Sequence, residues 1–312
     1  MKYDVIVIGE LNVDIILNRI DSFPEMGKEK IAEKMTTTLG SSSAIFASNI
    51  SSLGVKVAFL GKIGDDNYGG IIIDRLSAKG VKTDLIVTSQ EFNTGATIVL
   101  NFDEDRAMVT YPGAMDHLVI GDISDEQLSH AKHLHFSSCF LQPGIKRHLS
   151  ELFKRAKALG LTTSLDPQWD PAEDWELDLK NILPYVDVFL PNERELMLLT
   201  NRPDVESAID AVKDIANCVV VKMGNKGSLV YEKGKKSLKA PYLNDNVIDA
   251  IGAGDSFNAG FVFKYIKGQN INECQKFGNL MGAISTTRSG GTSAFSNYAN
   301  IMKIAHKKFN YK

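Results

Sequence analysis

The stretch DAIGAGDSFNAGF, from Asp249 to Phe261, joins a glycine-rich turn to an apolar helical pattern. Gly252 and Gly254 allow backbone dihedral angles that other residues avoid. The residues that follow are apolar at helical spacing, as Phe257 and Phe261 show. The pattern therefore predicts a glycine turn that opens directly into a buried helix.

The start of such a helix can bind an anion. Its first amide groups have no partner within the helix, and the helix dipole adds partial positive charge there. Asp255 falls in this first turn, where a carboxylate beside a bound phosphoryl group could deprotonate an attacking hydroxyl. Taken alone, the turn could equally be structural and Asp255 a helix cap. Other residues of the chain are needed to distinguish an anion site with a base at Asp255 from a structural turn with a helix cap.

Apolar strands alternate with amphipathic helices along most of the chain. Strands are expected at 5–9, 55–60, 133–138, 161–165, 186–190 and 218–222, and helices at 41–53, 68–79, from 125, 144–159, 193–199 and 205–215. This alternation predicts an α/β fold, a doubly wound, mostly parallel sheet with helices on both faces. With 312 residues, the chain is expected to form a single domain, 1–312.

Two β-leaning excursions, at about 11–39 and 92–112, interrupt this alternation. The second contains two alternating runs, 94–102 and 106–111, joined by the acidic turn DED, which indicates a hairpin. The excursions could be separate edge hairpins. Alternatively, they pair into a small β-sheet lid over the carboxyl edge of the main sheet, where open α/β folds bind ligands.

Polar pairs follow two of the predicted strands. Asn12 and Asp14 alternate after the strand 5–9, so both side chains point to one side and could bind hydroxyl groups, although solvated edge residues would look the same. Asn192 and Glu195 are three residues apart at a predicted helix start. They could hold a hydrated magnesium ion, or they could form a capping box.

Composition narrows the classes of partner. The net charge is −3 with no basic stripe, which argues against nucleic acid and favours a small molecule. No apolar stretch is long enough for a membrane span or a signal peptide, so we expect no membrane partner and a cytoplasmic location. Three scattered cysteines are expected to be reduced core thiols. His133 and His135 share a strand face without a third metal ligand, which favours a packed polar pair.

DAIGAGDSFNAGF resembles the C-terminal signature of the PfkB, or ribokinase-like, carbohydrate kinases. By this resemblance the amides of Gly252, Ala253 and Gly254 would form the anion hole, and Asp255 would be the catalytic base. The resemblance also implies that Asp14 and Asn12 bind the sugar, and that Asn192 and Glu195 act on phosphate and Mg²⁺, Glu195 through water. It implies a lid built from the two excursions.

Weaker similarities extend the site. The segment around Gly40 and Ser41 resembles the family's N-terminal signature, with Ile45 where an asparagine is usual. This resemblance implies substrate contacts for Gly40 and Ser41, which could offer backbone amides at a helix start. VVVKMGNKGS resembles the nucleotide strand and turn, which implies phosphate or nucleotide contacts for Lys222, Gly224 and Gly227. The resemblance assigns an adenine contact to Asn279 and a monovalent-cation loop to Asp249, Ile251, Ser285 and Gly290. Arg106, on the second hairpin, could contact the substrate or phosphate. Asp249 could equally brace its turn, and Arg106 could be solvated.

Together with the residue pattern, the resemblance implies an ATP-dependent kinase that phosphorylates a hydroxymethyl group of a sugar, with ATP and Mg²⁺ as cofactors and K⁺ as an optional one. A nucleoside kinase of the same family is the alternative, because the segment 40–45 departs from the family pattern. SLDPQWDP, 164–171, also departs from a D-P-N-x-R segment found in many members, which argues against a sugar acid. A sugar sensor without catalysis is a remote alternative, and an NAD(P) oxidoreductase lacks its glycine pattern. The lid edge could pair two chains into a homodimer.

Overall fold

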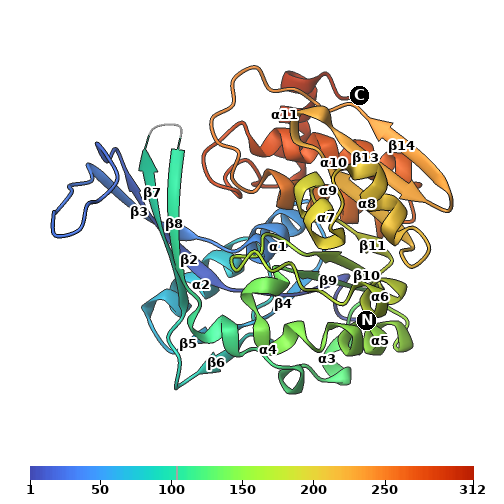
Figure 1. Cartoon of the computed structure of the whole chain (residues 1–312), viewed down its shortest axis with the longest axis horizontal. Helices are drawn as coiled ribbons and strands as arrows, with labels where there is room; N and C mark the ends of the chain where they lie inside the picture. Colours follow the sequence, from blue (N-terminus) through green and yellow to red (C-terminus); the bar gives the residue numbers. More distant parts are fainter. Residues whose placement is uncertain (103–104) are drawn as a thin grey trace.

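The computed structural model describes residues 1–102 and 105–312. Its main sheet has the strand order β14-β13-β12-β11-β10-β9-β1-β4 (Figure 1). The strands from β4 to β12 run parallel, and β13 and β14 are antiparallel. Their bounds are β1 Val5–Gly9, β4 Val57–Leu60, β9 His133–Ser137, β10 Thr162–Asp166, β11 Val188–Phe189, β12 Cys218–Lys222, β13 Ser228–Glu232 and β14 Lys235–Lys239.

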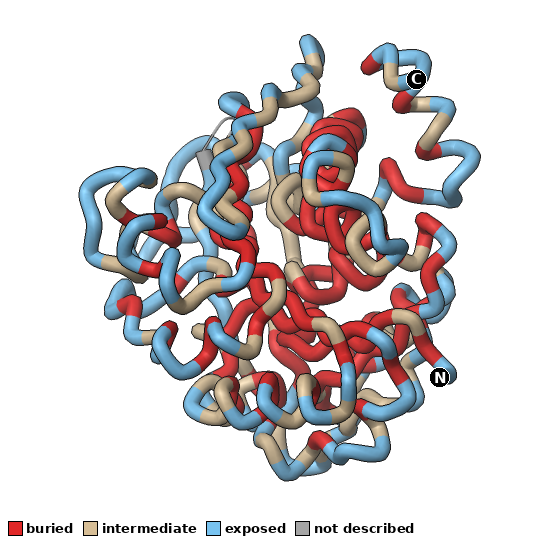
Figure 2. Tube along the Cα trace, turned by 90° about the vertical axis from the view of Figure 1, so that its right-hand side faces the viewer, coloured by how far each residue is buried: buried red, intermediate tan, exposed pale blue. Residues whose placement is uncertain are grey.

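Helices cover both faces of this sheet. One face packs on α1 (Ser42–Ser52), α2 (Asn67–Ala78), α9 (Ala253–Tyr265), α10 (Ile271–Ser285) and α11 (Tyr298–Phe309). The other packs on α3 (Asp125–Ser129), α4 (Pro143–Lys146), α5 (Leu149–Ala158), α6 (Leu179–Ile182), α7 (Glu193–Thr200) and α8 (Val205–Val212). Strand β1 supplies alternate side chains to the two cores, Val5 and Val7 to one and Ile6 and Ile8 to the other. Figure 2 shows the buried residues gathered in the interior and the exposed residues toward the outside. The doubly wound fold is confirmed.

A separate small sheet has the order β3-β2-β7-β8 and extends to one side of the main sheet (Figure 1). Its strands are β2 Asn12–Asn18, β3 Lys34–Leu39, β7 Gly95–Phe102 and β8 Asp105–Tyr111. Because β2 pairs with β7 in parallel, the two excursions do form one sheet. The predicted DED turn includes residues 103–104, which lie outside the described residues. A further two-stranded sheet joins β5 (Lys62–Gly64) to β6 (Val87–Ser89).

The structure differs from the sequence prediction in several elements, and two of these differences have clear local causes. The expected helix 144–159 is divided into α4 and α5 by a turn at Arg147 and His148. Ile145 and Leu149 are buried in the same core, so the apolar pattern continues across the turn and hides it. The hairpin β13–β14 was not predicted, although Lys233 and Gly234, both with positive φ, form the type of turn that joins two strands.

Buried polar and thiol groups agree with the sequence analysis. The three cysteines are buried and free. His133 and His135 share Ser164 between them, whose hydroxyl lies 2.8 Å from His133 Nε2 and 2.7 Å from His135 Nδ1. Burial lowers the pKa of His133 to about 3 and that of His135 well below its usual range. The pair is therefore neutral and packed, as the sequence favoured. None of the helices in the described part of the chain has the length and apolarity needed to span a bilayer.

Lowering the pH from about 7.5 to about 5 is expected to destabilise the fold through His133. Its folded pKa of about 3 lies below the ordinary value of 6.5, so the unfolded chain binds the proton first. The contribution of His133 to stability is present above pH 6.5 and is lost as the pH falls toward 3, by about 2 kcal/mol at pH 5. Urea denaturation at both pH values should show a smaller loss for His133→Gln than for the wild type.

His130→Gln provides the control, because the side chain of His130 is exposed. Buried carboxyl groups with raised pKa values act in the opposite direction, but they are shared by all the variants and cancel in the comparison. Equal losses in the His133→Gln variant and the wild type would contradict the prediction.

Candidate active site

Helix α9 begins at a left-handed glycine. Gly252 has a φ of +72° and precedes Ala253, the first helical residue. A Cβ atom at Gly252 would lie 2.7 Å from the Cα atom of Gly291, so both the dihedral angle and the space require glycine. The amide of Ala253 donates to the carbonyl of Ala250 at 3.2 Å. That amide is thus used by the turn, in contrast to the expected anion hole.

The next two amides remain available. Among residues 1–102 and 105–312, no carbonyl or side chain accepts a hydrogen bond from the amides of Gly254 and Asp255. Both lie in the first turn of α9, where the dipole favours an anion. The amides of Gly254 and Asp255 could therefore bind an anion at this helix start, whereas the sequence analysis assigned the anion hole to Gly252, Ala253 and Gly254.

Asp255 is buried beside other charged groups. Its side chain accepts one hydrogen bond, 2.9 Å from Nε2 of Gln168 to Oδ1. Burial, and then the negative charge of Asp166, raise the pKa of Asp255 to about 8, while Lys222 opposes this rise. A carboxylate whose pKa lies near the working pH is suited to act as a general base.

Asp166, at the end of β10, is the centre of this charged group. Its Oδ2 atom accepts hydrogen bonds from Lys222 Nζ at 2.6 Å, Asn258 Nδ2 at 2.5 Å and Gln168 Nε2 at 2.9 Å. Burial lowers the pKa of Lys222, but the charges of Asp166 and Glu195 outweigh burial and raise it. Lys222, predicted to contact phosphate, is thus held at the site as an ion pair.

Asn192 and Glu195 form a capping box at the start of α7. The Asn192 side chain accepts from the Glu195 amide at 2.8 Å, and Glu195 Oε2 accepts from the Asn192 amide at 2.8 Å. Glu195 Oε1 accepts from Asn192 Nδ2 at 2.6 Å. Burial and the charge of Asp166 raise the pKa of Glu195 to about 7. The cap that the sequence left open as an alternative is present, close to Asp166 and Lys222.

A pocket of about 430 Å³ adjoins the start of α9. Its lining includes most of the residues that the sequence assigned to the nucleotide: Lys222, Gly224, Gly227 and Asn279, together with Ala253 and Gly254. Apolar contacts come from Phe257, Val247 and Ala283. The Asn279 side chain donates through Nδ2 to the carbonyl of Ala240 at 3.1 Å, which fixes the orientation of this side chain in the pocket wall. The strand, the turn and the helix N-terminus thus meet around one cavity.

The predicted hydroxyl-binding residues gather at the base of the small sheet. Asn12 Nδ2 donates to Asp14 Oδ1 at 3.1 Å and to Thr97 Oγ1 at 2.9 Å. Burial raises the pKa of Asp14 to about 6, and the positive charge of Arg106 on β8 opposes this rise. The arrangement agrees with the expectation that Asn12 and Asp14 point to one side.

Gly40 contributes to this cluster differently from the expectation. Its amide donates to the carbonyl of Asn12 at 3.1 Å, so it is not free for a ligand. A Cβ atom at Gly40 would overlap the Asp14 carboxylate and lie 2.6 Å from Asn12 Nδ2. Its role is to leave room for those side chains. Ser41, with a φ of +68°, caps α1 by accepting from the amide of Ala44 at 2.9 Å.

Asp249 braces the loop before α9. Its Oδ1 atom accepts from the Ile251 amide at 2.9 Å, and its Oδ2 atom accepts from the Gly290 amide at 2.9 Å. The hydroxyl of Ser285 lies 3.5 Å from the carbonyl of Ile251. The structure therefore brings together all four residues assigned to the cation loop, and it shows the bracing contacts that were the alternative.

Sequence reasoning missed several members of the site. Asp166, Gln168 and Asn258 form its central hydrogen bonds, and buried Glu10 binds Ser43 through its carboxylate. Burial raises the pKa of Glu10 to about 7, and its charge in turn acts on Asp255. A usable signal existed, because Asp166 and Glu10 are acidic residues at the carboxyl ends of strands that are otherwise apolar.

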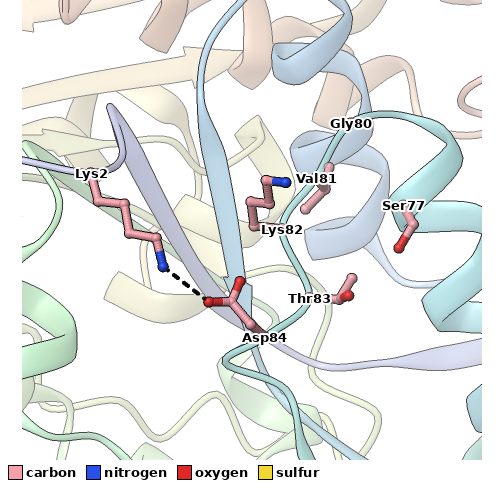
Figure 3. Close-up of a pocket in the computed structure, with 7 residues that line it drawn as sticks. All are labelled: Lys2, Ser77, Gly80, Val81, Lys82, Thr83 and Asp84. Atoms are coloured by element: carbon pink, nitrogen blue, oxygen red, sulfur yellow. Dashed lines mark hydrogen bonds and ion pairs between the residues drawn. The ribbon is translucent and has the colours of Figure 1, made fainter.

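A second hollow, of about 440 Å³, lies elsewhere (Figure 3). It is lined by Lys2, Ser77, Gly80, Val81, Lys82, Thr83 and Asp84, and an ion pair of 3.3 Å joins Lys2 to Asp84. None of the residues described above lines it. This hollow is therefore separate from the candidate site at the carboxyl edge of the main sheet.

The sheet order, the small sheet and the helix N-terminus define an α/β protein of the ribokinase fold. The ribokinase of Arabidopsis thaliana, solved with ribose and ATP, superposes with a TM-score of 0.86 at 24% identity, covering 97% of this chain and 99% of that one. The adenosine kinase of Sinorhizobium meliloti superposes with a TM-score of 0.85 at 26% identity, covering 98% of this chain and 100% of that one.

Sequence comparison gives the family. The sequence profile of the pfkB family of carbohydrate kinases matches residues 2–297, so the chain belongs to this family. An uncharacterized sugar kinase of Archaeoglobus fulgidus is 30% identical over 234 residues, which cover 75% of this chain and 92% of the relative. The predicted family and fold are confirmed.

Proposed function

We propose that the protein is an ATP-dependent kinase that transfers the γ-phosphoryl group to a hydroxymethyl group of a sugar. The observation that carries this proposal is the position of Asp255, buried at the start of α9 next to free amides and the pocket walled by Lys222 and Gly254. Asp255 would accept the proton of the acceptor hydroxyl, and the amides of residues 254 and 255 would stabilise charge on the phosphoryl group.

Magnesium fits the charge of this site. The charges of Asp166, Glu195 and Asp255 act on Lys222, and the pKa values of Glu195 and Asp255 are raised by the charge of Asp166 as well as by burial. No group of three or more acidic, histidine or cysteine side chains in the described residues is arranged to hold a metal ion directly. Contact through water, with Glu195 and Asn192 nearest, suits an ion that keeps its hydration and neutralises phosphate charge when bound.

The remaining assignments are parts of the same proposal. Asp14 and Asn12 would hold acceptor hydroxyls, with Arg106 beside them. The small sheet would act as the lid of a single-domain enzyme. The loop of Asp249 and Gly290 would bind K⁺, which a comparison of rates in potassium and tetramethylammonium salts can test. A homodimer through the lid and a cytoplasmic location stay predictions.

The acceptor class is tested by measuring ATP depletion across a panel of sugars, sugar phosphates and nucleosides. Turnover of ribose or fructose without adenosine is expected. A nucleoside acceptor is the second candidate, favoured by Ile45, an apolar residue where the family pattern has an asparagine; it packs against Gly252 and Gly291. Turnover of adenosine alone would exclude the sugar proposal, and no ATP consumption with any compound would favour a sensor.

Replacing Asp14 with asparagine is expected to raise KM for the acceptor about ten- to a hundredfold, with a smaller effect on KM for ATP. The substitution removes a half-buried carboxylate that is held by Asn12 and can accept a hydrogen bond from a hydroxyl. Initial-rate kinetics with each substrate varied in turn provide the measurement. Asp21→Asn, an exposed aspartate in the same excursion, is the control. Equal increases in both KM values would argue against a direct acceptor contact.

A further inference from the structure

Gln168 adopts a backbone conformation that glutamine rarely takes. It follows Pro167 in the loop after β10 and has a φ of +60°, in the left-handed region. Its amide donates to Asp166 Oδ1 at 3.3 Å. Left-handed residues other than glycine cluster at functional sites, because the surrounding structure must hold them there. The conformation turns the Gln168 side chain back over the carboxyl edge of the sheet.

The Gln168 side chain joins two carboxylates. Its Nε2 atom lies 2.9 Å from Asp166 Oδ2 and 2.9 Å from Asp255 Oδ1. A carboxamide nitrogen carries two hydrogens, so it can donate to both carboxylates at once. Asp166 has other donors, from Lys222 and Asn258. For Asp255, Gln168 is the only side-chain donor within residues 1–102 and 105–312.

We propose that Gln168 is a positioning residue for Asp255: it fixes Oδ1 by a hydrogen bond, leaves Oδ2 for the acceptor hydroxyl, and favours the ionised form of the base. This inference rests on the proposed function, in which Asp255 removes the hydroxyl proton. A hydrogen bond donated to a carboxylate stabilises its charged form, so loss of the donor must make the base harder to ionise.

The other groups around Asp255 cannot replace this donor. Asp166 from β10 and Glu10 after β1 are both acidic and disfavour ionisation of Asp255. Lys222 from β12 favours ionisation, but its Nζ atom is bonded to Asp166 and also faces Glu195 from α7. The free amides at the start of α9 support the carboxylate only through the dipole. Gln168 thus makes the direct contact that counters burial.

The test measures the ionisation of Asp255 with and without this donor. Gln168→Met removes the donor at nearly constant length, and Gln168→Asn withdraws it by one methylene while tolerating the left-handed conformation. The Asp255 carboxyl carbon is observed by NMR in aspartate-labelled protein, assigned by its absence in Asp255→Asn. Both variants are expected to raise the titration midpoint by about one pH unit relative to the wild type.

The second readout is kcat/KM against pH with an acceptor that the wild type phosphorylates. The rising limb is expected to move to higher pH in both variants, with about a tenfold loss near neutrality that recovers in part at alkaline pH. Gln275→Met is the matched control, because Gln275 is a buried glutamine that donates to the carbonyls of Ser228 and Ser237 outside the site. It should lower stability without moving the limb.

The two readouts separate the possible failures. An unchanged NMR midpoint in both variants would overturn the role of Gln168, whatever the activity. If the Gln168 variants raise the midpoint but the wild-type protein phosphorylates no acceptor, the contact between Gln168 and Asp255 is supported and the proposed kinase function is rejected. A midpoint that also moves in Gln275→Met would show a general effect of destabilisation and would overturn the inference.

Discussion

Asp255→Asn is expected to lower kcat about a thousandfold while the protein stays folded and still binds ATP. The amide has nearly the shape of the carboxylate but cannot accept the proton of the acceptor hydroxyl. Removing a buried carboxyl group whose pKa is raised to about 8 also removes an unfavourable charge, so the stability should not fall. Single-turnover measurement of phosphorylated product gives the rate, and equilibrium binding gives the ATP affinity.

Asp204→Asn is the matched control for this substitution. Asp204 caps α8 at the surface, where its side chain accepts from the amide of Ser207 at 2.8 Å. This variant should keep its activity. If Asp255→Asn retains more than about a tenth of the wild-type rate, general-base catalysis at Asp255 is rejected, because proton transfer by a positioned base contributes at least about a hundredfold.

Lys222→Met is expected to lower the free energy of unfolding by about 3–5 kcal/mol and to abolish activity near neutral pH. The substitution leaves Asp166, which is fully buried, without its counter-charge and near enough to Glu195 and Asp255 for its charge to act on both. Without the lysine, the pKa of Asp255 should rise further, since Lys222 is the charge that lowers it. Urea denaturation with parallel kinetics over pH measures both effects.

Lys226→Met tests whether the effect depends on burial. Lys226 lies in the turn that follows β12 and forms an ion pair with Glu193 at 3.2 Å. About two thirds of the Lys226 side chain is exposed. An exposed pair contributes about 0–1 kcal/mol, so this variant should be nearly as stable as the wild type. Similar losses for both lysine variants would mean that the Asp166–Lys222 pair has no special role.

The elements closest to α9 could be predicted because their signals are local. Gly252 and Asp255 lie within one short motif, and the buried strand β1 is a continuous apolar run. Pairing of the two excursions was one of two alternatives that the pattern left open, and the family resemblance favoured it. The capping box of Asn192 and Glu195 shows the limit of such signals, because one spacing serves both a helix cap and a magnesium site.

The centre of the site could not be predicted in this way. The contact between Gln168 and Asp255 joins residues 87 positions apart. It also depends on the left-handed backbone conformation of Gln168, which the sequence SLDPQ does not predict. Gly40 illustrates a related difficulty. It was expected to donate an amide, but its function is the volume that it leaves for Asp14. Such roles depend on neighbours that only the folded chain brings together.

The connection between the two sheets has one more consequence. Strand β1 ends at Gly9 and β2 begins at Asn12, so only Glu10 and Leu11 join them, and both are almost completely buried. An inserted residue would find no space to form a loop there, and a shift of β2 by one position would turn Asp14 to the opposite face of the small sheet. The number of residues between the main sheet and Asp14, the proposed acceptor contact, is therefore fixed. Grafting a small sheet from a relative would succeed only if the two-residue spacing between β1 and β2 is kept.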